Sequence, residues 1–146
     1  MTAGRLLAVD WGERRIGLAL SDETQTLAQP LTTLTRRAGK RFPMAQLLEL
    51  IAKHNVVGIV VGLPLNEAGE EGDAAHAARA LADDIKSRVS TELEVRMWDE
   101  RMTTARVLAS IREMGGKTRG RKEDVDAMAA ALLLQHYLDS KRGTAQ

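Results

Sequence analysis

Three carboxylic acids occupy positions in this sequence where folding alone gives little reason for an acid: Asp10, Glu100 and Asp126. Asp10 follows an apolar run at residues 6–9, and Glu100 comes shortly after a strand-like run at residues 93–98. Asp126 shares a helical face with small and apolar residues, where an uncompensated charge is costly. Taken singly, each acid could be a turn residue or a charge at a helix start. Taken together, they indicate a functional group.

Acids gathered from distant parts of a chain repel one another, and divalent cations relieve that repulsion. Two cations roughly 4 Å apart, bridged by a carboxylate, are the arrangement used for phosphodiester hydrolysis. The chain has no cysteine, and oxygen ligands favour Mg²⁺ or Mn²⁺. The three acids therefore predict a two-metal site that acts on a phosphodiester.

The pattern around these acids predicts an α/β fold. Continuous apolar runs are typical of central strands, and alternation at residues 15–20 is typical of a hairpin strand. Pro30 favours an edge or a bulge in the third strand. We expect strands at 6–9, 15–20, within 25–34, at 56–61 and at 93–98, and helices at 42–54, 73–89, 103–114 and 123–138. This order predicts a mixed five-stranded sheet, an antiparallel meander plus parallel strands, flanked by helices. We expect one domain over residues 1–139 and a disordered tail at 140–146.

Composition narrows the setting. The chain has 146 residues, 44% hydrophobic and 28% charged, and no apolar run long enough for a membrane span. We expect a cytoplasmic protein without a membrane partner. The formal charge is only +1, but the basic residues gather in two clusters that predict contact with a nucleic-acid backbone. The clusters are Arg36, Arg37, Lys40 and Arg41, and Lys117, Arg119, Arg121 and Lys122.

Four motifs in order give a family resemblance. Residues 10–17 match D-x-G-x-x-R-x-G, residues 61–64 match V-G-L-P, residues 99–104 match D-E-R-x-T-T, and residues 126–130 match D-x-x-A-A. In this order and spacing, the chain resembles the YqgF (RuvX-type) family of the RNase H-like superfamily. The resemblance covers residues 6–138.

The resemblance implies an RNase H-like fold and a divalent-metal endonuclease whose metal ligands are Asp10, Glu100 and Asp126. It implies that Arg15 supports the site or contacts phosphate, and that further motif residues support the acids. These are Gly12, Arg101, Thr103 and Thr104. The expected substrate is the 5′ end of precursor 16S rRNA, in ribosome biogenesis. The alternative is branched DNA, cut as by a Holliday junction resolvase. The protein could be a monomer or a homodimer. A fourth acid is not singled out, and Asp99 and Asp124 are the nearest options.

Two other functions compete with the nuclease. A D-x-G turn followed by a hairpin also opens actin-like ATP phosphotransferases, but that architecture needs two such domains. A non-catalytic nucleic-acid binding module on the same scaffold is the other alternative. Such a module would have lost one or more of the acids, and this chain keeps all three.

Overall fold

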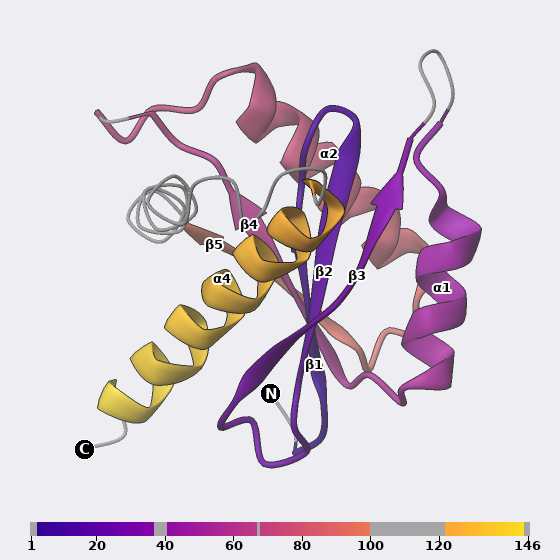
Figure 1. Cartoon of the computed structure of the whole chain (residues 1–146), viewed down its shortest axis with the longest axis vertical. Helices are drawn as coiled ribbons and strands as arrows, with labels where there is room; N and C mark the ends of the chain where they lie inside the picture. The colour runs from indigo at the N-terminus through magenta and orange to yellow at the C-terminus, as the bar shows by residue number, and fades with distance from the viewer. Residues whose placement is uncertain (1–2, 37–40, 67, 100–121, 145–146) are drawn as a thin grey trace.

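A computed structural model describes residues 3–36, 41–66, 68–99 and 122–144 of the chain (Figure 1). It contains a mixed five-stranded sheet with the order β3-β2-β1-β4-β5. The strands are β1 (Leu6–Asp10), β2 (Arg15–Ser21), β3 (Ala28–Thr35), β4 (Gly58–Leu63) and β5 (Glu94–Asp99). β1, β2 and β3 pair antiparallel, and β4 lies parallel to both β1 and β5. The predicted meander that leads into parallel strands is confirmed.

The two continuous apolar runs form the centre of the sheet. β4 is buried along its whole length, and β1 is buried up to its last residue, Asp10, which is half-buried. β3 is an edge strand, and its register against β2 shifts between Leu18 and Ala19, opposite Pro30. An edge and an irregularity are the places where a sheet tolerates a residue without an N–H. Pro30 therefore sits where its chemistry predicts.

Helices cover both faces of the sheet (Figure 1). On one face, α1 (Met44–Lys53) and α2 (Asp73–Arg88) bury apolar stripes against alternate residues of β1, β2 and β4, such as Leu7, Val9 and Val61. On the other face, α4 (Lys122–Thr144) packs against the remaining residues of these strands, such as Leu6 and Ala8. Period-two alternation along β1 places Asp10 on the same face as Leu6 and Ala8, beneath α4.

The last helix is longer than the sequence predicts. α4 continues to Thr144, so residues 140–144 are helical and not a disordered tail. Lys141 lies in its last turn, where positive charge stabilises a helix end. Residues 145–146 and the predicted helix at 103–114 lie outside the described part of the chain. Among the helices that the structure describes, none is both long enough and apolar enough to cross a bilayer.

This topology defines one end of the molecule. The parallel strands β1, β4 and β5 all finish at the same edge of the sheet, as their registers show. The chain then turns from β1 into β2 at that edge, and α4 begins there (Figure 1). In open α/β sheets, ligands bind beyond the carboxyl ends of the strands. A functional site is therefore expected at the edge of the sheet that follows Asp10.

Candidate active site

Asp10 and Asp126 are brought together through Gly17. In the sheet, Asp10 pairs directly with Gly17 of β2. A Cβ atom on Gly17 would lie 2.0 Å from the carbonyl oxygen of Asp126 and 2.4 Å from its carbonyl carbon. The α4 backbone at Asp126 therefore rests directly on the cross-strand neighbour of Asp10, and paired residues in antiparallel strands lie roughly 5 Å apart. Two acids 116 positions apart in number share one corner of the fold.

Arg15 completes this corner. Its Nε donates to Oδ2 of Asp126 at 2.7 Å, a bond between residues 111 apart in the sequence. The two side chains are 34% and 31% exposed, so the pair is neither buried nor fully solvated. Arg15 lies on the same face of β2 as Gly17. The positive charge of Arg15 therefore balances the negative charge of Asp126.

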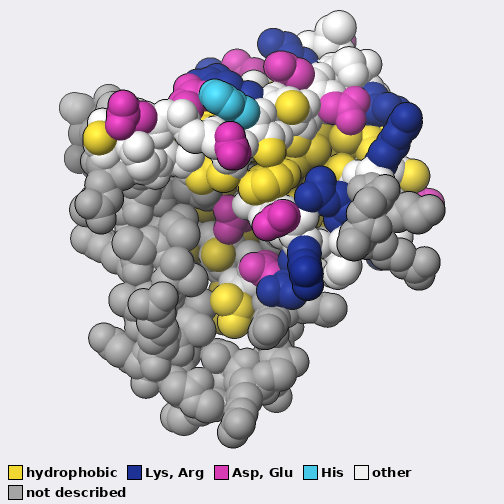
Figure 2. Space-filling model, turned by 90° about the horizontal axis from the view of Figure 1, so that it is seen from above, with side chains coloured by type: hydrophobic (Ala, Val, Ile, Leu, Met, Phe, Trp, Pro, Cys, Tyr) yellow, Lys and Arg dark blue, Asp and Glu magenta, His cyan; other side chains and the backbone are white. Residues whose placement is uncertain are grey.

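The turn between β1 and β2 is tightly closed. A Cβ atom on Gly12 would lie 2.3 Å from the carbonyl oxygen of Arg15, so only glycine allows the chain to double back here. The turn is also tied to the end of β3, because the Arg36 N–H donates to the Arg14 carbonyl at 2.7 Å and the Arg36 guanidinium donates to the Glu13 carbonyl. Gly12 thus shapes the turn that follows Asp10. Figure 2 views the molecule from this end and shows acidic and basic side chains next to each other.

Several predicted site residues lie outside the described part of the chain. Glu100 does, and so do Arg101, Thr103 and Thr104. The described chain reaches Asp99, the last residue of β5, which pairs with Leu63 at the end of β4. Of the acids considered as a fourth ligand, Asp99 is described and exposed, while the side chain of Asp124 is not described. β5 nevertheless directs the chain towards the same edge of the sheet as Asp10.

The basic clusters are described only in part. Arg36 and Arg41 are described, and the remaining members of the first cluster, Arg37 and Lys40, are not. In the second cluster, Lys117, Arg119 and Arg121 lie outside the described residues, and Lys122 is described only as the first residue of α4. Arg36 holds the β1–β2 turn, as shown above, so its role is at least partly structural. The predicted substrate contacts of the other basic residues stay predictions.

The donor set suits Mg²⁺ or Mn²⁺. Asp10 and Asp126 offer only oxygen atoms, and these hard cations prefer carboxylate oxygens. Gly17 carries no side chain, so the Asp126 backbone approaches the strand that pairs with Asp10. Within the described residues, no three acids, histidines or cysteines come together as a metal site. The predicted third ligand, Glu100, is outside those residues, so the pair of acids fits a metal as two members of the expected trio.

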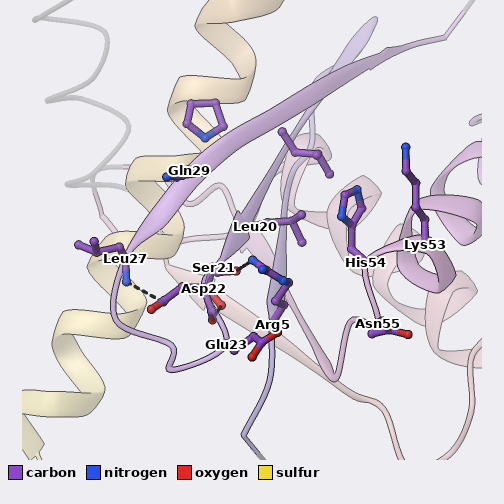
Figure 3. A pocket seen from close by; sticks show the side chains of 12 residues that line it. Arg5, Leu20, Ser21, Asp22, Glu23, Leu27, Gln29, Lys53, His54 and Asn55 are labelled. Atoms are coloured by element: carbon purple, nitrogen blue, oxygen red, sulfur yellow. Dashed lines mark hydrogen bonds between the residues drawn. The ribbon is translucent and has the colours of Figure 1, made fainter.

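A pocket of about 720 Å³ lies at the opposite end of the sheet, near the start of β1 (Figure 3). Its polar groups hold the β2–β3 turn. The Asp22 carboxylate accepts hydrogen bonds from the backbone N–H groups of Thr26 at 2.7 Å and Leu27 at 3.0 Å. Arg5 donates to the Ser21 carbonyl at 3.1 Å. This pocket contains none of the predicted site residues, and its charged groups stabilise local structure.

Two contacts could not be foreseen from the sequence. Gly17 is part of a motif, but only the structure shows that its missing side chain admits the α4 backbone. The only earlier signal is a glycine inside a strand, which often marks close backbone approach. The second contact joins Trp98 to His136, whose rings lie 5.7 Å apart between centroids. His136 has no partner nearby in the sequence that would have identified it.

A family model and curated relatives match nearly the whole chain. A family model described as "RuvX: Holliday junction resolvase" matches residues 4–140. The chain is 40% identical over 137 residues to a "Putative pre-16S rRNA nuclease" of Chloroflexus aurantiacus, covering 94% of this chain and 88% of that protein. It is 38% identical over 137 residues to a protein of the same description from Acetivibrio thermocellus, covering 94% and 96%.

Among solved structures, the chain is similar to Thermus thermophilus RuvC, described as "in complex with Holliday junction substrate". The TM-score is 0.57, the sequence identity is 16%, and 97% of each chain is covered. At this identity the similarity establishes the fold alone, which is the predicted RNase H-like fold.

Proposed function

This chain belongs to the RuvX family, and from that premise we propose that it is a metal-dependent endonuclease that processes the 5′ end of precursor 16S rRNA. The single observation that carries the proposal is the corner in which Gly17 joins Asp10 to Asp126. That corner lies at the carboxyl end of the central strand, on an RNase H-like sheet. Its acids are those that the sequence singled out before any comparison.

Asp10, Asp126 and Glu100 would hold two Mg²⁺ or Mn²⁺ ions. When bound, such ions lower the pKa of a water molecule and offset the negative charge on the phosphate. Asp10 projects from a rigid central strand, and Asp126 projects from a helix that is pinned to the sheet at Gly17. Ligands on such elements keep their positions without the substrate, which favours catalysis because little reorganisation is needed.

Arg15 would have two roles in this site. In the metal-free protein it neutralises Asp126 and limits repulsion between the acids. Its guanidinium has further N–H groups beyond the Nε that binds Asp126, and these suit a phosphate oxygen. Arg15 would therefore orient Asp126 and present a positive charge to the substrate backbone at once.

The substrate assignment rests on the relatives that are described as pre-16S rRNA nucleases. The second candidate is cleavage of a four-way DNA junction, which the description of the matching family favours. A junction resolvase cuts two strands symmetrically and is expected to be a two-fold dimer, whereas an RNA-processing nuclease can act as a monomer. We place the reaction in the cytoplasm.

Cleavage of two substrates side by side tests the proposal. The purified protein is given Mn²⁺ and either a 5′ segment of precursor 16S rRNA or a four-way DNA junction. We expect cleavage of the RNA, loss of that cleavage with chelator, and loss with Asp10→Asn. Cleavage of the junction alone by a dimer would favour the resolvase. Phosphate release from ATP without cleavage of either substrate would support the phosphotransferase, and tight binding without metal-dependent cleavage would support a binding module.

A further inference from the structure

Aromatic side chains of β5 and α4 contact one another: Trp98 lies on β5, and His136 and Tyr137 lie on α4. Trp98, the next-to-last residue of β5, donates its indole N–H to Nδ1 of His136 at 3.1 Å. The Trp98 ring also contacts the edge of Tyr137, with centroids 5.1 Å apart at an angle of 87°. The whole chain has only two tryptophans, one tyrosine and one phenylalanine. Two of these four aromatic residues, Trp98 and Tyr137, therefore lie in this cluster.

The cluster is layered from the core to the surface. Tyr137 is 2% exposed and anchors the cluster in the core beneath α4. Trp98 is half-buried, and His136 is exposed. The T-shaped contact between Trp98 and Tyr137 stabilises the packing of β5 against α4. Packing alone does not require an imidazole on the solvent side, so the exposed ring is available for another role.

The hydrogen bond from Trp98 selects one tautomer of the neutral His136 ring. Because Nδ1 accepts the indole proton, the proton of the neutral imidazole lies on Nε2, where it is available as a donor. The bond also fixes the orientation of an otherwise free surface ring. The two rings are tilted by 59° to each other, so a nucleobase can stack on one ring while its edge contacts the other.

Two cations flank the rings. Arg96 lies on the same face of β5 as Trp98, and its guanidinium donates to Glu94 at 3.1 Å. The pKa of Arg96 is raised, first by Glu94 and then by the Tyr137 phenol, so its charge is firmly held. Lys141 places its Nζ 5.4 Å from the centroid of the Tyr137 ring. Aromatic surface bordered by Arg and Lys is the combination with which proteins bind single-stranded nucleic acid.

We propose that Trp98 and His136 form a stacking site for an unpaired nucleotide of the substrate, with Arg96 and Lys141 holding the neighbouring phosphates. This proposal rests on the proposed nuclease function and names the substrate feature that the enzyme reads. His136 lies ten residues beyond Asp126 on α4, about 15 Å along the helix axis. A stacked strand advances about 3.4 Å for each nucleotide, so the site reads a base about four nucleotides from the cut. The substrate must therefore have a single-stranded segment next to the bond that is cleaved.

Binding without cleavage tests this site. With chelator present, the affinity is measured for a short single-stranded RNA and for its blunt duplex. The variants are His136→Ala, Trp98→Phe, which retains a ring but loses the N–H, and Trp98→Ala. His76→Ala is the matched control, because His76 is an exposed histidine on α2. We expect His136→Ala and Trp98→Ala to weaken single-strand binding about fivefold or more, with Trp98→Phe intermediate. Duplex binding and the control should change less than twofold.

A second measurement does not depend on whether the Trp98→Ala variant folds. In a Trp11→Phe background, Trp98 is the sole tryptophan, and single-stranded RNA should quench its fluorescence while duplex RNA should not. Glu94→Gln removes the anion beside Arg96 and should strengthen single-strand binding. Two results would overturn the stacking site. One is that the variants weaken binding of single-stranded and duplex RNA equally, and the other is that neither RNA quenches the fluorescence of Trp98. If the wild type still cleaves precursor RNA in that case, the nuclease proposal stands and only the subsite is lost.

Discussion

The side chain of Arg15 reaches Asp126 across 111 residues of sequence, with Nε 2.7 Å from Oδ2. This ion pair connects the start of β2 to the first turns of α4 beside the Gly17 contact. It joins Asp126, one predicted metal ligand, to β2, and β2 pairs with the strand that carries the other ligand, Asp10. The corner thus has a cation of its own before any metal arrives.

Arg15→Gln should destabilise the metal-free protein by about 1 kcal/mol or less, because each partner is about a third exposed and solvent screens the pair. Urea unfolding at low and high salt measures this, and the loss should shrink at high salt. Arg88→Gln is the control, since Arg88 pairs with Asp84 at 3.0 Å on the open surface of α2. A loss from Arg15→Gln no larger than that from Arg88→Gln would show that the pair does not hold the corner.

Metal binding should stabilise the protein through Asp10 and Asp126. A ligand that binds only the folded state adds about 2.7 kcal/mol at a hundredfold excess over its Kd. We expect Mn²⁺ to raise the Tm of the wild type and to leave the Tm of Asp10→Asn and of Asp126→Asn almost unchanged. Asp22→Asn, at the opposite end of the sheet, should respond as the wild type does. A full Mn²⁺ response in Asp10→Asn would remove Asp10 from the metal site.

The same two variants separate repulsion from pairing. If repulsion among the acids were the only effect, replacing any of the three would leave the stability of the metal-free protein unchanged or raise it. For Asp126, the ion pair with Arg15 reverses that expectation, because Asp126→Asn removes an attraction. Without metal, Asp10→Asn should therefore be at least as stable as the wild type, and Asp126→Asn slightly less stable.

Gly17→Ala should break the corner. The new Cβ would overlap the backbone carbonyl of Asp126, and backbone cannot rotate away as a side chain can. Overpacking of this kind costs about 1–3 kcal/mol, and the shift of α4 should abolish cleavage. Thermal unfolding and the cleavage assay measure the two effects. Gly72→Ala is the control, because a Cβ there meets nothing within 4 Å. A stable, active Gly17→Ala variant would disprove the close contact.

Asp22 should make folding sensitive to acid. Hydrogen bonds from the Thr24 hydroxyl and from the Leu27 and Thr26 N–H groups lower the pKa of Asp22 from 3.8 to about 2. A lowered folded-state pKa stabilises the protein above the unfolded value and loses that effect as the pH falls through the folded value. The wild type should therefore be more stable than Asp22→Ala at neutral pH, with the gap closing between about pH 4 and pH 2. Thermal melts across this range measure it, and a constant gap would contradict the assignment.

The second basic cluster should dominate the salt dependence of substrate binding. Each phosphate contact contributes about 0.7–0.9 to the slope of log affinity against log salt. Replacing all four residues by Gln should lower the magnitude of the slope by about 3. These are Lys117, Arg119, Arg121 and Lys122. The control removes the same number of charges from α1 and α2, at Lys53, Arg79, Lys86 and Arg88. Equal slopes for the two variants would show that net charge, and not this cluster, attracts the substrate.

The sequence predicted the order and type of the described strands and helices but not the contacts between them. Apolar runs and alternation predicted the strands to within about two residues, because burial on one or both faces of a sheet leaves a local pattern. α4 was predicted too short, because residues 139–144 are all polar or glycine and show no apolar helical pattern. The meeting of Gly17 with Asp126, and of Trp98 with His136, depends on how α4 crosses the sheet. Nothing local in the chain encodes that crossing.

The crossing of α4 also orders events during synthesis. The ribosome adds Asp10 long before Asp126, and Asp126 joins Asp10 only when α4 packs on the hairpin of β1 and β2. A nascent chain that has emerged only as far as β5 contains one of the three predicted metal-binding acids, Asp10. The proposed nuclease would therefore be unable to cut the RNA of the ribosome that is translating it until α4 has left the exit tunnel.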